Sequence, residues 1–234
     1  MKKLLKMQTL SIYIALLAII ALFSILSPTF LSVSNALTIL RQISSLGIMA
    51  MGMMFVMLLG NVDLSVGTSV SLIGICMAYF MVNMHLSIGV TVLLGIAIGL
   101  VIGFLNGFVV TYCKIPSIIA TLGTSWVFKG LSYTICNAQP IYGFPEGFAK
   151  LGQGSAGPIP IPVILFIICV LITSFVMNRT VYGRTLYAVG SNKEASRLSG
   201  TNVNFMNLSA YVICAAFATL AGIILLSRVN SGQA

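Results

Sequence analysis

The chain alternates between long apolar runs and short polar connections. Seven apolar runs approach the roughly 20 residues that an α-helix needs to cross the hydrocarbon core of a bilayer. They cover approximately residues 9–26, 42–59, 64–82, 86–112, 117–136, 161–177 and 205–226. This pattern predicts an all-α polytopic membrane protein with about seven transmembrane helices, which form a single transmembrane domain over residues 1–234.

Two of the connections are long. Residues 137–160 are polar and rich in glycine and proline, which is typical of a surface loop. Residues 179–204 carry four basic residues, Arg179, Arg184, Lys193 and Arg197. Because cytoplasmic loops of membrane proteins hold an excess of Lys and Arg, residues 179–204 are predicted to be cytoplasmic and residues 137–160 external.

Composition supports the membrane assignment. Charged residues make up 6% of the chain, against about a quarter in soluble domains, and the mean hydropathy is +1.09. The first run is too long for a cleaved signal and is predicted to be retained as a span. With a cytoplasmic N-terminus, eight of the twelve Lys and Arg residues fall inside and four outside. The net charge of +9 therefore indicates topology in the plasma membrane and not a nucleic-acid partner.

A short helix is predicted within the basic loop. Ser191 and Glu194 have the spacing of a capping box, in which the hydroxyl accepts the third helical amide and the carboxylate reaches back to the cap amide. Gly200 ends the helix, because glycine readily takes the left-handed conformation. About two turns are too few to be stable alone, so this helix is expected to dock against a partner. Ala195 and Leu198 give it a small apolar face.

Residues 60–67, with the sequence Gly-Asn-Val-Asp-Leu-Ser-Val-Gly, predict an interruption between the second and third runs. Asp63 is one of three acids in the chain, and an acid at membrane depth needs partners. The glycines on both sides predict a broken helix whose free amides satisfy the carboxylate. Two interpretations stay open: Asp63 fixes a bend at a translocation pathway, with Asn61 and Ser65 beside it, or it caps the third span.

The fourth run carries a glycine every four residues, which places them on one helix face: Gly95, Gly99, Gly103 and Gly107. Without a hydrophobic force between helices in lipid, small residues favour close backbone packing, and the alternative is a pore lining. Asn106 lies on an adjoining face. It is expected to form a hydrogen bond with a neighbouring helix, or else to face the pathway.

Four motifs resemble one family. Residues 194–196, Glu-Ala-Ser, with Gly200, resemble the Glu-Ala-Ala loop of ABC-importer membrane subunits, and the longer run 182–200 resembles the ribose-type sugar permeases. Residues 60–67 resemble the family's Gly-Gly-Ile-Asp-Leu-Ser-Val-Gly, with Asn61 in place of the second glycine. Residues 103–107 resemble its Gly-x-x-Asn-Gly, and residues 114–124 resemble its Lys-x-Pro to Ala-Thr-Leu-Gly-Thr.

The resemblance implies a permease subunit of a ribose/xylose/arabinose-type, or autoinducer-2-type, ABC sugar importer. It implies cytoplasmic ATP-binding subunits, an external solute-binding protein and a second permease copy or paralogue within the lipid. The short helix then becomes a cytoplasmic coupling helix that sits in a groove of the ATPase. Its coupling residues would be Glu194, Ala195, Ser196, Arg197 and Gly200. Family members continue past residue 233 with further spans, so this chain is expected to be part of a longer permease.

No catalytic motif accompanies these features. The sequence lacks a Gly-x-x-x-x-Gly-Lys-Ser/Thr phosphate loop and a His-Glu-x-x-His metal motif, and His85 is its only histidine. We therefore expect no enzyme activity, cofactor or metal site in this subunit. The alternative function is a secondary transporter of a small polar solute, driven by an ion gradient. That function needs ionisable residues near the bilayer midplane, and Asp63 is the nearest candidate.

Overall fold

A computed structural model describes residues 2–233, with side chains from residue 12 onward. The long helices are α1 (Lys2–Leu26), α2 (Val33–Leu58), α3 (Val66–Val82), α4 (Ile88–Thr111), α5 (Ser117–Cys136), α7 (Ile161–Arg179) and α10 (Val203–Val229). Each corresponds to one of the seven predicted apolar runs, so the predicted all-α fold is confirmed apart from one small hairpin. The shorter elements are α6 (Ala149–Gln153), β1 (Ser155–Ala156), β2 (Ile159–Pro160), α8 (Val181–Ser191) and α9 (Lys193–Leu198).

Helix boundaries differ from the apolar runs where polar residues extend a helix. The bounds of α5 agree with the prediction at both ends, and Pro116 stands just before its first residue. α2 begins at Val33, well ahead of its apolar run, because the Ser32 hydroxyl accepts a hydrogen bond from the Asn35 amide at 3.2 Å and caps the polar first turn. Hydropathy alone does not detect such a polar beginning.

The chain divides into two compact units, Met1–Leu40 and Arg41–Ala234. In the first unit, Phe23 stacks on Phe30 with ring centroids 5.7 Å apart, and the Asn35 side-chain amide donates to the Phe30 carbonyl at 2.7 Å. These contacts hold the turn between α1 and α2. The side chains of Lys2, Lys3 and Lys6, which entered the charge-based topology, lie outside the described residues.

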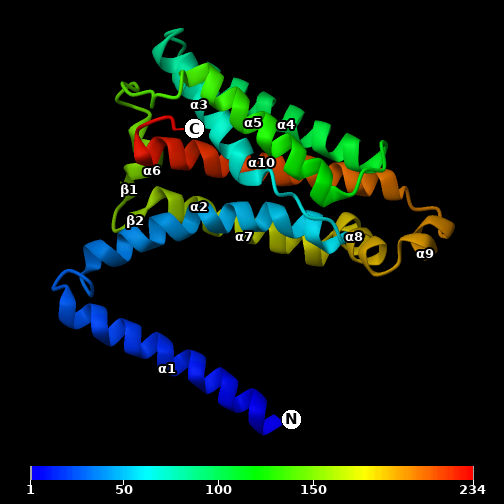
Figure 1. The fold of residues 1–234 in the computed structure, drawn as a ribbon, viewed down its shortest axis with the longest axis horizontal. Coiled ribbons are helices and arrows are strands. Elements are labelled where there is room, and N and C mark those ends of the chain that lie inside the picture. Colours follow the sequence, from blue (N-terminus) through cyan, green and yellow to red (C-terminus); the bar gives the residue numbers. More distant parts are fainter. Residues whose placement is uncertain (1, 234) are drawn as a thin grey trace. The chain divides into compact units, whose positions relative to one another are not determined.

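The second unit is built around α4 and α10, which lie side by side over much of their length (Figure 1). The glycine stripe makes this packing close. A Cβ on Gly103 would lie 2.6 Å from the Ala215 Cβ and 2.8 Å from the Tyr211 carbonyl oxygen. On Gly95, a Cβ would meet the Met77 side chain of α3. All four glycines are buried, so the stripe packs against neighbouring helices.

The elements of the two long loops lie at opposite ends of the second unit (Figure 1). At one end, the Ser227 hydroxyl donates to the Phe148 carbonyl at 2.6 Å and accepts from the Gly152 amide at 2.7 Å, which fixes α6 on α10. The Arg41 guanidinium donates to the Ser155 hydroxyl of β1 at 3.1 Å at the same end. α8 and α9 lie at the other end.

Four helices are long and apolar enough to cross a bilayer, counted over the residues that the structure describes. They are α2, α4, α7 and α10. Two further apolar helices are shorter, the part of α1 from Ile12 to Leu26 and α3. The structure is thus that of a polytopic membrane protein.

Candidate functional site

The predicted helix in the basic loop exists as α9, but its cap is a different residue. Ser191 is the last residue of α8 and the prediction that it caps α9 is wrong. The N-cap is Asn192, whose side-chain oxygen accepts from the Ala195 amide at 2.9 Å. A cap residue needs a non-helical backbone, which Asn192 has with φ of −153° while Ser191 continues the preceding helix.

Four of the five coupling candidates are exposed on α9 or just after its end. Glu194 forms an ion pair with Arg197 at 2.7 Å, and both side chains are about two-thirds exposed. It therefore does not form the predicted capping box. Ala195 is exposed and Leu198 is 80% exposed, whereas Ser196 is buried. Gly200 has φ of +83°, which only glycine adopts readily, and it ends the helix as predicted. α9 thus presents an apolar residue beside an ion pair.

α8 joins this surface to the bundle. The Thr180 hydroxyl accepts from the Gly183 amide at 3.2 Å and donates to the Val176 carbonyl of α7 at 2.6 Å, which caps α8 and ties it to α7. Leu186 and Val189 are completely buried. The polar pattern of residues 179–204 predicts a loop here, and the structure shows a helix instead. The signal that could have found the helix is Thr180 three residues before Gly183, followed by buried apolar positions spaced three apart.

A linker of residues 59–65 separates α2 from α3. Gly60 has φ of +73°, and the Gly60 and Asn61 amides donate to the carbonyls of Met57 and Val56, which closes the end of α2. The residue with a left-handed backbone is therefore Gly60. Asn61 does not need a positive φ, so an asparagine is accommodated where the family has a second glycine. The Asn61 side-chain amide donates to the Asn207 side-chain oxygen of α10 at 3.1 Å.

Asp63 is the centre of a buried polar cluster with Ser65 and Asn106. One Asp63 carboxylate oxygen accepts from the Ser65 amide at 2.9 Å and from the Ser65 hydroxyl at 2.6 Å. The Asn106 side-chain amide of α4 donates to the Ser65 hydroxyl at 2.7 Å. Burial raises the pKa of the Asp63 carboxyl, an effect that the hydrogen bonds from Ser65 and Asn106 oppose. The cluster fixes the beginning of α3 and joins it to α4.

Two hydroxyls of α5 hold the other side of the linker. Ser117 accepts from the Val62 amide at 3.3 Å, and Thr121 accepts from the Leu64 amide at 3.0 Å. The sequence does not predict these two contacts. Their spacing of four residues puts both hydroxyls on one helix face, but sequence alone does not say that this face meets the linker.

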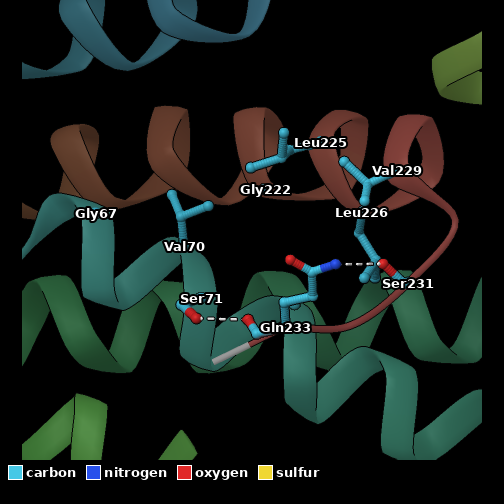
Figure 2. Close-up of a pocket in the computed structure, with 10 residues that line it drawn as sticks. Gly67, Val70, Ser71, Gly222, Leu225, Leu226, Val229, Ser231 and Gln233 are labelled. Carbon is cyan, nitrogen blue, oxygen red and sulfur yellow. Dashed lines mark hydrogen bonds between the residues drawn. The ribbon is translucent and has the colours of Figure 1, made fainter. Parts of the chain in front are cut away.

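A cavity of about 270 Å³ lies between α3 and α10 (Figure 2). Gly67 and Gly74 of α3 and Gly222 of α10 are among its lining residues. Ser71 donates to the Gln233 carbonyl at 2.8 Å, so the C-terminal residues close part of the cavity. The sequence-predicted pathway candidates are absent from its lining, because the linker cluster faces α4 and α5 instead.

The described residues contain no group of three or more His, Cys, Asp or Glu side chains that could hold a metal ion. The Asp63 cluster contains hydrogen-bonded polar groups at the beginning of α3. The other candidate site is the exposed helix α9, which follows the partly buried helix α8. Such features suit conformational change and docking of a protein partner. The class of protein that the fold defines is a multi-pass helical membrane protein.

Comparison with known proteins places the chain more closely. A family model described as the permease component of a branched-chain amino acid transport system matches residues 35–234. The chain therefore belongs to this family of transport permease subunits, which are not enzymes.

The relatives it resembles are sugar permeases. The ribose import permease of Haemophilus influenzae is 36% identical, with 94% of this chain and 69% of the relative covered. The ribose import permease of Bacillus subtilis is 37% identical, with 97% and 71% covered. The L-arabinose permease of Escherichia coli is 35% identical, with 90% and 64% covered. No solved structure matches the chain significantly.

Proposed function

We propose that this protein is a permease subunit of an ATP-driven importer for a ribose-like monosaccharide. The observation that carries the proposal is the similarity to ribose import permeases along nearly the whole chain, at 36 to 38% identity. The exposed, capped α9 gives this function a site of action. It supplies a surface on which a separate ATPase can bind, as an ATP-driven permease without its own phosphate loop requires.

The topology proposed is seven spans with a cytoplasmic N-terminus. The contacts at the two ends of the second unit support it. Arg41 lies with the loop of residues 137–160, which alternation assigns to the outside. Gly190 of α8 lies against Leu58 at the end of α2, and the Val62 amide that follows α2 donates to Ser117 at the beginning of α5. Three segments that alternation assigns to the inside therefore lie at the same end of the second unit. Under this topology the Asp63 cluster lies at the inner membrane surface.

The proposed partners follow from this arrangement. Cytoplasmic ATP-binding subunits dock on the exposed face of α9, with Ala195 and Leu198 entering a groove and Glu194 and Arg197 at its edge. A solute-binding protein delivers sugar at the outer end, near residues 137–160. A second permease copy or paralogue completes the pathway within the lipid. ATP-driven closure of the ATPases then tilts the bundle between inward-open and outward-open states.

The test uses the full transporter, with its ATPase and binding protein, reconstituted in lipid vesicles. We expect uptake of radiolabelled D-ribose that requires ATP. Replacing Ala195 with Trp should abolish uptake and release the ATPase, because the bulky ring prevents α9 from entering the groove. The matched control is Ala97→Trp, at an exposed position of α4, which should retain uptake. Uptake driven by an ion gradient without ATP would instead support a secondary transporter and contradict the proposal.

A further inference from the structure

The coupling loop touches the linker through one backbone contact. Gly190 stands in the last turn of α8, and a Cβ at this position would collide with the carbonyl oxygen of Leu58 and lie 3.1 Å from its carbonyl carbon. Leu58 is the last residue of α2 and directly precedes the linker of residues 59–65. Only glycine allows the two backbones to come this close.

α8 and α9 are held so that a displacement of one moves the other. A single residue, Asn192, connects them; its amide donates to the Ala188 carbonyl at 3.0 Å while its side chain caps α9. The buried side chains of Leu186 and Val189 belong to one apolar cluster with Leu59, the first linker residue. A close-packed cluster deforms little, so α8 and the end of α2 are expected to shift as one body.

Beyond Leu59 the linker is held by individual hydrogen bonds to three other helices. Asn61 is bonded to α10, Leu64 to Thr121 of α5, and Ser65 to Asn106 of α4. A single hydrogen bond contributes little net stability, so the linker is more easily rearranged than the packed cluster that moves it. A shift at Leu58 therefore reaches α3, α4, α5 and α10 through a segment that has no helical structure of its own.

We propose that Gly190 is a positioning residue of the transport cycle: its contact with Leu58 carries the motion of ATPase-bound α9 to the linker of residues 59–65, and the linker passes it to the four helices. This inference rests on the proposed function, because it takes docking of an ATPase on α9 as given. It adds the contacts through which a displacement of α9 is transmitted to the other helices. Family membership alone does not specify these contacts.

The experiment is hydrogen exchange of backbone amides, measured by mass spectrometry on the full transporter in lipid nanodiscs with and without ATP and vanadate. Peptides from α9 report ATPase docking, and peptides covering residues 60–65 report the linker. In the native protein, ATP and vanadate should change linker exchange by at least about fivefold, the lower end of typical coupling between sites. In Gly190→Ala, the linker response should disappear while α9 stays protected by the ATPase.

Two further variants make the result specific. Gly130→Ala is the matched control, because a Cβ at Gly130 in α5 meets nothing within 4 Å, and it should keep the native linker response. Val189→Ala removes buried volume instead of adding a clash and should reduce the response partially, which tests the inference even where Gly190→Ala does not fold.

The outcomes separate the inference from the proposed function. A linker response that is unchanged in both Gly190→Ala and Val189→Ala would overturn the route through Leu58. If the α9 amides of the native protein were not protected from exchange in the full transporter, this would instead contradict ATPase docking, and with it the proposed function. Protected α9 with an unresponsive linker in the native protein would overturn the inference alone.

Discussion

Replacement of Asp63 tests whether the carboxylate acts as a hydrogen-bond acceptor that fixes the beginning of α3. Asp63→Ala removes the acceptor for two donors of Ser65, the amide at 2.9 Å and the hydroxyl at 2.6 Å. Ser65 is fully buried, so water cannot replace the acceptor easily. Hydrogen bonds to a charged group contribute about 1.5–3 kcal/mol each.

The expected loss for Asp63→Ala is about 2–4 kcal/mol in the free energy of unfolding, less than the full sum of two such bonds. The reason for the smaller value is that the Ser65 hydroxyl can turn toward the Ser69 hydroxyl, 3.5 Å away. Asp63→Asn keeps an acceptor oxygen at the same place and removes the cost of burying a charge. We expect its loss to stay within about 1 kcal/mol.

The assay is equilibrium unfolding in mixed micelles of a mild detergent and dodecyl sulfate, followed by circular dichroism, on the native protein and both variants. Native-like unfolding of Asp63→Ala would refute the argument that these bonds stabilise the linker. An Asn variant as unstable as the Ala variant would show that the negative charge, and not the acceptor geometry, stabilises the site.

Two other predictions concern packing and capping. Gly103→Ala should lower the free energy of unfolding by about 1–3 kcal/mol, because its Cβ has no space against α10, whereas Gly130→Ala should leave it nearly unchanged; equal stabilities would contradict close α4–α10 packing. Asn192→Ala should cost α9 about 1 kcal/mol and speed amide exchange in residues 195–198, while Ser191→Ala should not. Faster exchange in the Ser191 variant alone would restore the capping assignment made from sequence.

The helical segments could be predicted from sequence because membrane insertion imposes a strong local rule. A backbone in hydrocarbon must satisfy its own hydrogen bonds, so a long apolar run becomes a helix whatever its neighbours are. The glycine spacing of α4 likewise predicted a close-packed face, and Gly200 predicted a helix end. These features depend on residues near one another in the chain.

The details of both sites depended on neighbours that are distant in sequence. Asn192 caps α9 in place of the predicted Ser191 because α8 continues to Ser191. α8 forms where Leu186 and Val189 are buried in the bundle, and no local sequence pattern predicted this burial. The partner of Asn61 is Asn207, 146 residues later.

What the sequence determined by itself was which segments form long apolar helices, where these helices break and which family the chain belongs to. The tertiary structure decided which polar groups meet, with the linker amides bound by α5 hydroxyls and the Gly190 backbone against Leu58. The physical reason is one of range. Hydrophobic transfer and backbone hydrogen bonding act on each segment separately, whereas pairing of side chains between helices depends on how the helices pack.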